Sequence, residues 1–183
     1  MYIYLNKIQK VIEKINFKGK YYPQLQGEGF ASQYAFPFAK KILSGNVIDI
    51  GCMKKEWSFP NSRPIDIDFN DGFDAMNLPL TDSNELWDGI FSSHCLEHLP
   101  NYVEALGYWN SMLLKGGVLF LYLPNCEYQS YWRAWHNKKH IHYLTPHLFK
   151  KYFEDNNDIW INSIVTDGYD LNGSFYCIAQ KLF

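Results

Sequence analysis

The segment "FSSHCLEHLP", residues 91–100, places His94, Glu97 and His98 at the spacing H-x-x-E-H. On a helix, this spacing lets two histidines bind a zinc ion while the glutamate lies beside the metal-bound water of a hydrolase. Here His94 ends a run typical of a strand, and Pro100 lies two residues after His98, so a helix is not expected at this point. A zinc hydrolase is therefore the third interpretation of the chain, and no metal ligand is predicted.

The elements that position these side chains alternate between strand and helix patterns. A helix is expected after Asn101, which is a suitable N-cap with Glu104 as capping-box partner, and Gly116 and Gly117 are expected to end it. Short apolar, β-branched runs predict buried parallel strands at 46–51, 63–68, 87–93 and 118–124. Such alternation predicts an α/β fold with an open, mostly parallel sheet.

The amino-terminal third differs from this pattern. Apolar residues at helical spacing predict amphipathic helices over 2–16 and over 32–43, separated by a segment rich in proline and glycine. We expect residues 1–45 to form a helical cap and residues 46–183 to form the α/β domain, within one compact unit.

The carboxyl-terminal part predicts a helix and a hairpin. Thr145 is a suitable N-cap with Pro146 in the first helical position, and 158–182 contains two strand patterns around a turn rich in glycine and aspartate. On the other side of the sheet, too few residues lie between Cys52 and Asp74 for full crossover helices. That edge should be trimmed, and another subunit, as in a homodimer, or the amino-terminal helix could cover it.

Composition excludes several function classes. The net charge of −2 and pI near 6.3 give no long-range attraction to phosphate backbones or anionic lipid, so neither nucleic acid nor membrane is an expected partner. No segment has the length and apolar character of a membrane span or signal peptide. The widely spaced cysteines are expected to be free thiols of a reduced, cytoplasmic protein.

The order of short motifs carries more information than any single one. "VIDIGC", "PIDID", "FDAMNLPL", "LWDGIFSSHCLEHL" and "LLKGGVLFLYLP" follow one another between residues 46 and 124. In this order they resemble the motif series of the class I S-adenosylmethionine-dependent methyltransferases, of the small-molecule type. The segment "HIHYLTPHLF" extends the resemblance more weakly to about residue 154. The resemblance to this family implies a Rossmann-like sheet and S-adenosylmethionine as cofactor.

The resemblance also implies roles for individual residues at the carboxyl ends of the strands. The turn at Gly51 would meet the methionine carboxylate with backbone N–H groups. Asp66, with Asp68 as second choice, would accept the ribose hydroxyls, as acids do in dinucleotide folds. Asp74 would lie near the adenine amino group with Ala75 beside the ring. The remaining predicted cofactor contacts are Asp49, which could instead orient the turn, Cys52, which could instead be a packing residue, and Ser93 and His94 at the rim.

The chain departs from the family at the glycine motif, where G-C-G-x-G is replaced by "GCMKKEW". Met53 occupies a position where a small residue permits close backbone approach, and Lys54 or Lys55 could instead bind the carboxylate by charge. This departure keeps open an alternative function, a methyltransferase-like binding or partner subunit without catalysis.

The implied reaction is in-line methyl transfer to a hydroxyl or amine of a small molecule or of a glycan sugar. A general base helps if the acceptor is a hydroxyl, and His94, His140 and His142 are the candidates because imidazole titrates near neutral pH. Glu97 and His98 are expected to form a structural pair, with the imidazole hydrogen-bonded to backbone.

Overall fold

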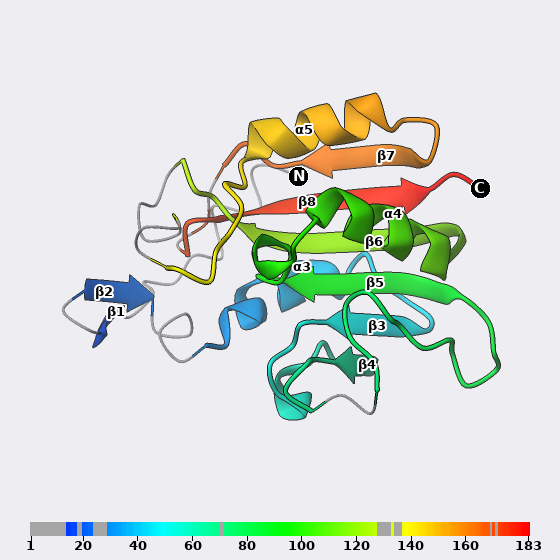
Figure 1. Cartoon of the computed structure of the whole chain (residues 1–183), viewed down its shortest axis with the longest axis horizontal. Coiled ribbons are helices and arrows are strands. Elements are labelled where there is room, and N and C mark those ends of the chain that lie inside the picture. The colour runs from blue at the N-terminus through cyan, green and yellow to red at the C-terminus, as the bar shows by residue number, and fades with distance from the viewer. Residues whose placement is uncertain are drawn as a thin grey trace.

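A computed structural model describes residues 14–17, 20–23, 29–69, 72–127, 133, 137–168, 170 and 172–183 (Figure 1). Its main sheet has six strands in the order β4-β3-β5-β6-β8-β7. Their bounds are β3 Val47–Ile50, β4 Ser62–Ile65, β5 Trp87–Ser93, β6 Leu113–Pro124, β7 Trp160–Val165 and β8 Ser174–Lys181. Strands β4, β3, β5 and β6 pair in parallel, whereas β8 pairs antiparallel with β6 and β7. The predicted α/β class with a carboxyl-terminal antiparallel hairpin is confirmed.

The sheet is buried on both faces because successive side chains of its central strands point into different clusters. In β5, Ile90 packs into one cluster and Phe91 into the other. In β6, Leu121 and Tyr122 divide in the same way. The near-continuous apolar runs in the sequence follow from this double burial.

Helix α4, Tyr102–Met112, and helix α5, Pro146–Asp155, contribute to the cluster on one face (Figure 1). Both begin as predicted: Asn101 Oδ1 accepts from Glu104 N at 3.2 Å, and Thr145 Oγ1 accepts from Leu148 N at 3.1 Å. The prediction that Gly116 and Gly117 end α4 is wrong, because the helix stops at Met112 and Leu113 already pairs with Trp87 of β5. The glycines instead lie within β6, where Gly116 has a φ of 77°.

The predicted helix over 32–43 exists as two short pieces, the 3₁₀ helix η1 at Ala31–Tyr34 and helix α3 at Phe36–Ala39. A continuous helix is interrupted because Pro37 has no N–H to donate to the preceding turn. Ala31, Ala35, Ala39 and Leu43 are buried in the cluster on the second face of the sheet. This segment therefore packs on the sheet itself.

The predicted helix over 2–16 is wrong for its last residues. Strand β1, Lys14–Phe17, pairs antiparallel with β2, Lys20–Pro23, in a separate two-stranded sheet. Polar and apolar residues alternate over 14–17, so a period of two fits this end as well as a helical period does. Residues 2–13 of the prediction lie outside the described residues, and the division into a cap and an α/β domain stays a prediction.

The trimmed side of the sheet is confirmed for the described residues. The connection from β3 to β4 contains one helical element, the short 3₁₀ helix η2, Lys55–Trp57. The described residues between β4 and β5 contain no helix. Strand β4 is the edge strand on this side. The turns after β3 and β4 are thus close in sequence, which matters for the site.

We expect Asn101→Ala to lower the free energy of unfolding by about 1 kcal/mol, because Glu104 N loses its acceptor at the start of α4. Asn101→Asp should retain most of the stability, because a carboxylate also accepts this bond. Urea denaturation of the two variants measures both values. Equal stability of Asn101→Ala and the wild type would show that the cap contributes nothing.

Candidate functional site

The chain order reverses between β3 and β5, which are neighbours in the sheet although β4 lies between them in sequence. In open α/β sheets, ligands bind outside the carboxyl ends of the strands at such a point. Gly51 follows β3 there with a φ of 83°, and a Cβ on it would lie 2.6 Å from Cβ and 2.7 Å from Sγ of Cys95. Glycine is therefore required at this position because of a side chain of the protein itself, and the predicted contact of Gly51 with the cofactor stays a prediction.

The turn after Gly51 is held against the end of β4. Met53 N donates to Asp66 Oδ2 at 2.6 Å, and Gly51 N donates to Ile65 O at 2.8 Å. Met53 has a φ of 64°, a backbone conformation that the family's glycine would adopt at less cost. Asp66, the first choice for the ribose hydroxyls, thus joins the turn after β3 to the turn after β4.

The other two predicted acids, Asp68 and Asp74, follow β4 in the chain. Asp68 is exposed, and its N–H donates to Asp66 Oδ1 at 3.1 Å. Asp74 is exposed and accepts from Met76 N at 2.7 Å, while the carbonyl of Ala75 accepts from Trp109 Nε1 at 2.7 Å. The Asp74 loop is therefore fixed on α4 with its carboxylate toward solvent.

Asp49 is buried, with an exposed fraction of 1 %, and its Oδ2 accepts from Phe59 N at 2.6 Å. Burial is the main reason that the pKa of Asp49 is raised to about 7. The negative charge of Asp66 raises this pKa further, whereas the hydrogen bond from Phe59 N lowers it. This contact lies within the connection that follows the turn. It favours the alternative in which Asp49 orients the turn over direct contact with the cofactor.

The cysteines of the edge are packing residues in this structure. Cys52 is buried, and burial is the largest cause that raises the pKa values of the Cys52 and Cys95 thiols. Both therefore stay protonated at neutral pH and are poor nucleophiles. Ser93 is buried at the last position of β5, and its neighbour Ser92 donates to Ile50 O of β3 at 2.9 Å.

Glu97 is completely buried, and three imidazole nitrogens surround its Oε1. His94 Nδ1 lies 3.4 Å away, His140 Nε2 lies 3.8 Å away and His98 Nε2 lies 3.9 Å away. Burial, the largest influence, raises the pKa of Glu97, but contact with His94 and the charges of the three histidines outweigh it, so the net shift is downward. Glu97 is therefore ionised at neutral pH.

Two backbone contacts bring this cluster together. His98 Nδ1 bonds to Lys139 O at 2.8 Å, and Ile141 N donates to Glu97 O at 2.9 Å, which places His140 beside the carboxylate. The expected bond from His98 to backbone is confirmed. Residues 96–98 form the 3₁₀ turn η3, Leu96–His98, and His94 follows the last residue of β5 with a φ of 52°. The α-helix of a zinc hydrolase is therefore absent here, as predicted.

The three candidate bases separate into two groups. His94 and His140 adjoin Glu97, whereas His142 Nε2 bonds to Leu99 O at 2.6 Å and its ring contacts Tyr102. Sequence analysis missed the convergence of Glu97 and His98 with His140. The available signal was the second histidine segment, "HIH", but nothing in its local pattern shows which strand end it approaches.

A second polar group that sequence analysis missed lies beside His94. His94 Nε2 is 3.0 Å from Ser174 Oγ, and Ser174 N donates to Asp170 Oδ1 at 3.1 Å. Tyr122 OH donates to the other oxygen of Asp170. Burial raises the pKa of Asp170 more than these hydrogen bonds lower it. The end of β6 and the start of β8 thus support the His94 side chain.

The nucleoside part of S-adenosylmethionine fits the acids at this edge. Each carboxylate oxygen of Asp66 accepts one backbone N–H and has a further lone pair, and Asp68 and Asp74 are exposed. The predicted carboxylate-binding turn fits less well, because the N–H groups of Gly51, Met53 and Lys54 all donate within the protein. Lys54 lies over the Trp57 ring, with Nζ 4.1 Å from its centroid.

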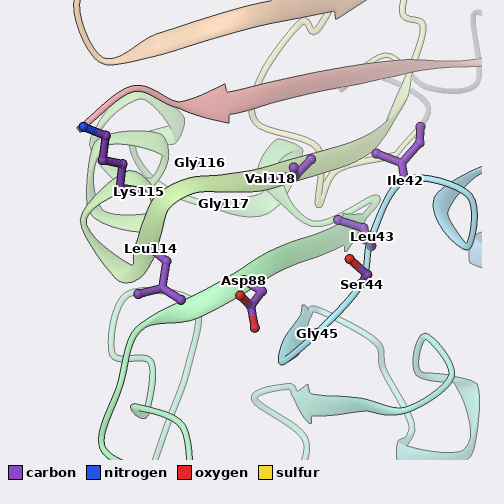
Figure 2. Close-up of a pocket in the computed structure, with 10 residues that line it drawn as sticks. All are labelled: Ile42, Leu43, Ser44, Gly45, Asp88, Leu114, Lys115, Gly116, Gly117 and Val118. Atoms are coloured by element: carbon purple, nitrogen blue, oxygen red, sulfur yellow. The ribbon is translucent and has the colours of Figure 1, made fainter.

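A separate pocket lies at the opposite edge of the sheet (Figure 2). It is bordered by Asp88 near the start of β5, by Gly117 and Val118 of β6 and by residues 42–45 before β3. Because parallel strands begin at one edge and end at the other, this pocket is remote from the turns after β3 and β5. We do not assign the cofactor to it.

The parallel core, the switch point and the acids after β4 define an α/β protein of the class I methyltransferase type. Residues 24–157 match the profile of a family described as "Methyltransferase domain", and the chain belongs to this family. The predicted enzyme class, an S-adenosylmethionine-dependent methyltransferase, is thereby confirmed. No curated protein matches the chain in sequence.

Solved structures of methyltransferases share this fold. A methyltransferase from Thermotoga maritima, described as a possible histamine N-methyltransferase, has a TM-score of 0.60 at 14 % identity, with 86 % of this chain and 92 % of that chain covered. A methyltransferase from Archaeoglobus fulgidus has a TM-score of 0.60 at 18 % identity, with 86 % and 99 % covered. The N-methyltransferase NodS from Bradyrhizobium japonicum WM9, in complex with S-adenosyl-L-homocysteine, has a TM-score of 0.54 at 13 % identity, with 87 % and 91 % covered.

Among the described residues, no helix has the length and apolar character needed to cross a membrane.

We expect Gly51→Ala to lower the free energy of unfolding by about 2–4 kcal/mol, because the new Cβ meets Cys95 at a positive φ. Gly107→Ala is the matched control: Gly107 lies in α4 with open space around its Cα, so alanine should stabilise the protein by about 0.5–1 kcal/mol. Urea denaturation compares them. A Gly51→Ala protein as stable as the wild type would contradict the close approach of Gly51 to Cys95.

The buried Asp49 makes stability depend on pH. Its pKa is raised from 3.8 to about 7 in the folded protein, so its stabilising contribution is complete below pH 3.8 and is lost as the pH rises through 7. Asp49→Asn keeps an acceptor for Phe59 N but cannot ionise. Relative to the wild type, this variant should therefore gain up to about 4 kcal/mol between pH 4 and pH 8.

Urea denaturation of wild type and Asp49→Asn at both pH values measures this gain. The exposed Asp82→Asn serves as control and should show little such change. A constant difference between wild type and Asp49→Asn would mean that the carboxyl titrates normally.

Proposed function

We propose that the protein transfers a methyl group from S-adenosylmethionine to a hydroxyl or amine of a small molecule or of a glycan sugar. The observation that carries this proposal is the bond from Met53 N to Asp66 Oδ2 at 2.6 Å. It aligns the turn after β3 with the acid after β4 at the switch point, where the family's motifs imply the cofactor site. Membership of the methyltransferase family supports the reaction type.

Several residues would hold the cofactor. Asp66, with Asp68 beside it, would accept the ribose hydroxyls, and Asp74 would bind the adenine amino group. The turn at Gly51 and Cys52 would face the methionine end, with Ser93 and His94 at the rim. Bound S-adenosylmethionine supplies an electrophilic methyl group on a sulfonium sulfur. The protein then contributes mainly by holding the acceptor in line with that group.

A hydroxyl acceptor also needs a group that can take its proton. His142 is suited to this role because its Nε2–H donates to Leu99 O, which leaves Nδ1 as an acceptor in the neutral ring. His94 and His140 are the other candidates, and both adjoin the Glu97 carboxylate. An amine acceptor needs less assistance from a base.

The acceptor class is supported by charge. The chain carries a net charge of −2, and the described carboxyl edge presents the acids Asp66, Asp68 and Asp74. A polyanion such as nucleic acid would be repelled from this edge. A neutral or cationic metabolite or a sugar is compatible with it.

A specific observation favours the second candidate, a methyltransferase-like binding subunit without catalysis. The N–H groups of Gly51, Met53 and Lys54 donate to Ile65 O, Asp66 and Cys52 O, so these amides cannot meet a carboxylate without rearrangement. Cofactor binding therefore separates the two functions.

We expect isothermal titration calorimetry to show binding of S-adenosylhomocysteine and S-adenosylmethionine to one site in the wild-type chain. Asp66→Asn should weaken both by about 10- to 100-fold, because it removes a charged acceptor worth about 1.5–3 kcal/mol per hydrogen bond. Asp82→Asn, an exposed carboxylate remote from this turn in sequence, is the control and should bind as the wild type does.

Thermal unfolding of the Asp66→Asn protein shows whether the turn still folds without the charge. Asp68→Asn provides an independent comparison, because no hydrogen bond of its carboxylate supports the described turn. If the folded wild type binds neither compound, the methyltransferase function is rejected and the binding-subunit alternative is retained.

A further inference from the structure

The cluster around Glu97 contains a buried charge that the methyl-transfer reaction does not explain. Glu97 is fully buried, and neither of its carboxylate oxygens has a hydrogen-bond partner among the described residues. An ionised carboxylate in such a place is costly unless a cation balances it. The nearest groups are the imidazoles of His94, His98 and His140.

The orientation of His98 favours a metal ion as this cation. Its Nδ1 must carry a proton to donate to Lys139 O, because a carbonyl oxygen only accepts. In the neutral ring the lone pair is then on Nε2, which faces Glu97 Oε1 at 3.9 Å. A backbone carbonyl on one nitrogen and a cation on the other is the usual arrangement of a metal-binding histidine.

The spacing of the ligand atoms suits one ion. One ligand atom from each of Glu97, His98 and His140 lies within 4.8 Å of the others, and the two nitrogens lie 3.9 and 3.8 Å from Glu97 Oε1. Atoms that each lie about 2.0–2.2 Å from a shared tetrahedral ion are roughly 3.3–3.6 Å apart. Each nitrogen would have to move about half an ångström closer to Oε1, and the widest pair would have to close by roughly 1–1.5 Å.

The ligands are also held before any ion arrives. The bonds from His98 to Lys139 O and from Ile141 N to Glu97 O fix both segments relative to each other. His94, whose Nδ1 is 3.4 Å from the same oxygen and whose Nε2 is 3.0 Å from Ser174 Oγ, is a positioning residue for the carboxylate. His98 is exposed, so an ion can reach the site from solvent.

We propose that Glu97, His98 and His140 form a binding site for one divalent transition-metal ion of the zinc type. Two imidazoles and one carboxylate suit Zn²⁺ or Co²⁺, whereas Mg²⁺ and Ca²⁺ take oxygen ligands. Three protein ligands leave a coordination position for water or for an oxygen of the acceptor, whose acidity the ion would increase. The sequence predicted no metal ligand, and this proposal departs from that prediction without invoking a helical zinc motif.

The test is metal binding by untagged, chelator-treated protein without cofactor, so that it is independent of methyl transfer. Calorimetry with Zn²⁺ should show one ion per chain, and Co²⁺ should give the visible absorption of a protein-bound ion with nitrogen ligands. Glu97→Gln and His98→Ala should each weaken binding by more than 100-fold. Mg²⁺ should give no comparable signal.

His147→Ala is the matched control, because His147 is exposed at the start of α5 and is not part of the cluster. It should bind Zn²⁺ as the wild type does. Glu97→Gln alters a buried residue, so circular dichroism must show that it folds, and the exposed His98→Ala decides the question if it does not. Absence of a bound ion in the wild type, or equal affinity in His98→Ala and His147→Ala, would overturn the proposal and leave a protonated histidine as the partner of Glu97.

Discussion

The close contact between Gly51 and Cys95 is the constraint on which the candidate site depends. Parallel pairing of β3 and β5 brings the ends of the two strands together, and only a hydrogen atom fits between the first turn and the Cys95 side chain. The turn after β3 therefore bends toward β4, where Met53 N meets Asp66. On the other side, the chain leaves β5 at His94 and enters the η3 turn, which places Glu97 inside the protein.

The two buried carboxylates of this edge are stabilised in different ways. Asp49 accepts one hydrogen bond from a backbone N–H, and no positive charge stabilises its ionised form. Burial therefore dominates, and the pKa of Asp49 rises. Glu97 has imidazoles around it, and their charge outweighs burial. Asp49 therefore fits a structural role below the turn. Glu97 is ionised only beside a positive partner, and either a protonated histidine or a bound metal ion can supply that charge.

The trimmed connections give the edge its character. With only η2 between β3 and β4, the turn residues bond to one another rather than to a long crossover helix. On the second face of the sheet, residues 31–43 pack on the aromatic side chains of β5, β6 and β8. The departures from the family's glycine motif are thus accompanied by a short turn in which Asp66 accepts a hydrogen bond from Met53 N.

Much of the fold follows from local pattern. Apolar runs predicted the strands because strands buried on both faces need such runs, and Asn101 and Thr145 predicted helix starts because their side chains bond N–H groups three residues ahead. The order of the motifs predicted the family and the edge at which its acids lie. The helix over 14–16 failed because a short run fits two periods, and the end of α4 failed because strand pairing begins before the glycines.

The sequence by itself therefore determined the strand and helix pattern, the family and the residues near the carboxyl edge, since these depend on neighbours along the chain. Only the tertiary structure decided that Asp66 bonds to Met53, that Cys95 lies against Gly51 and that His140 joins Glu97 and His98. These contacts join segments distant in sequence. They depend on strand register and on how loops pack, and no local periodicity encodes either.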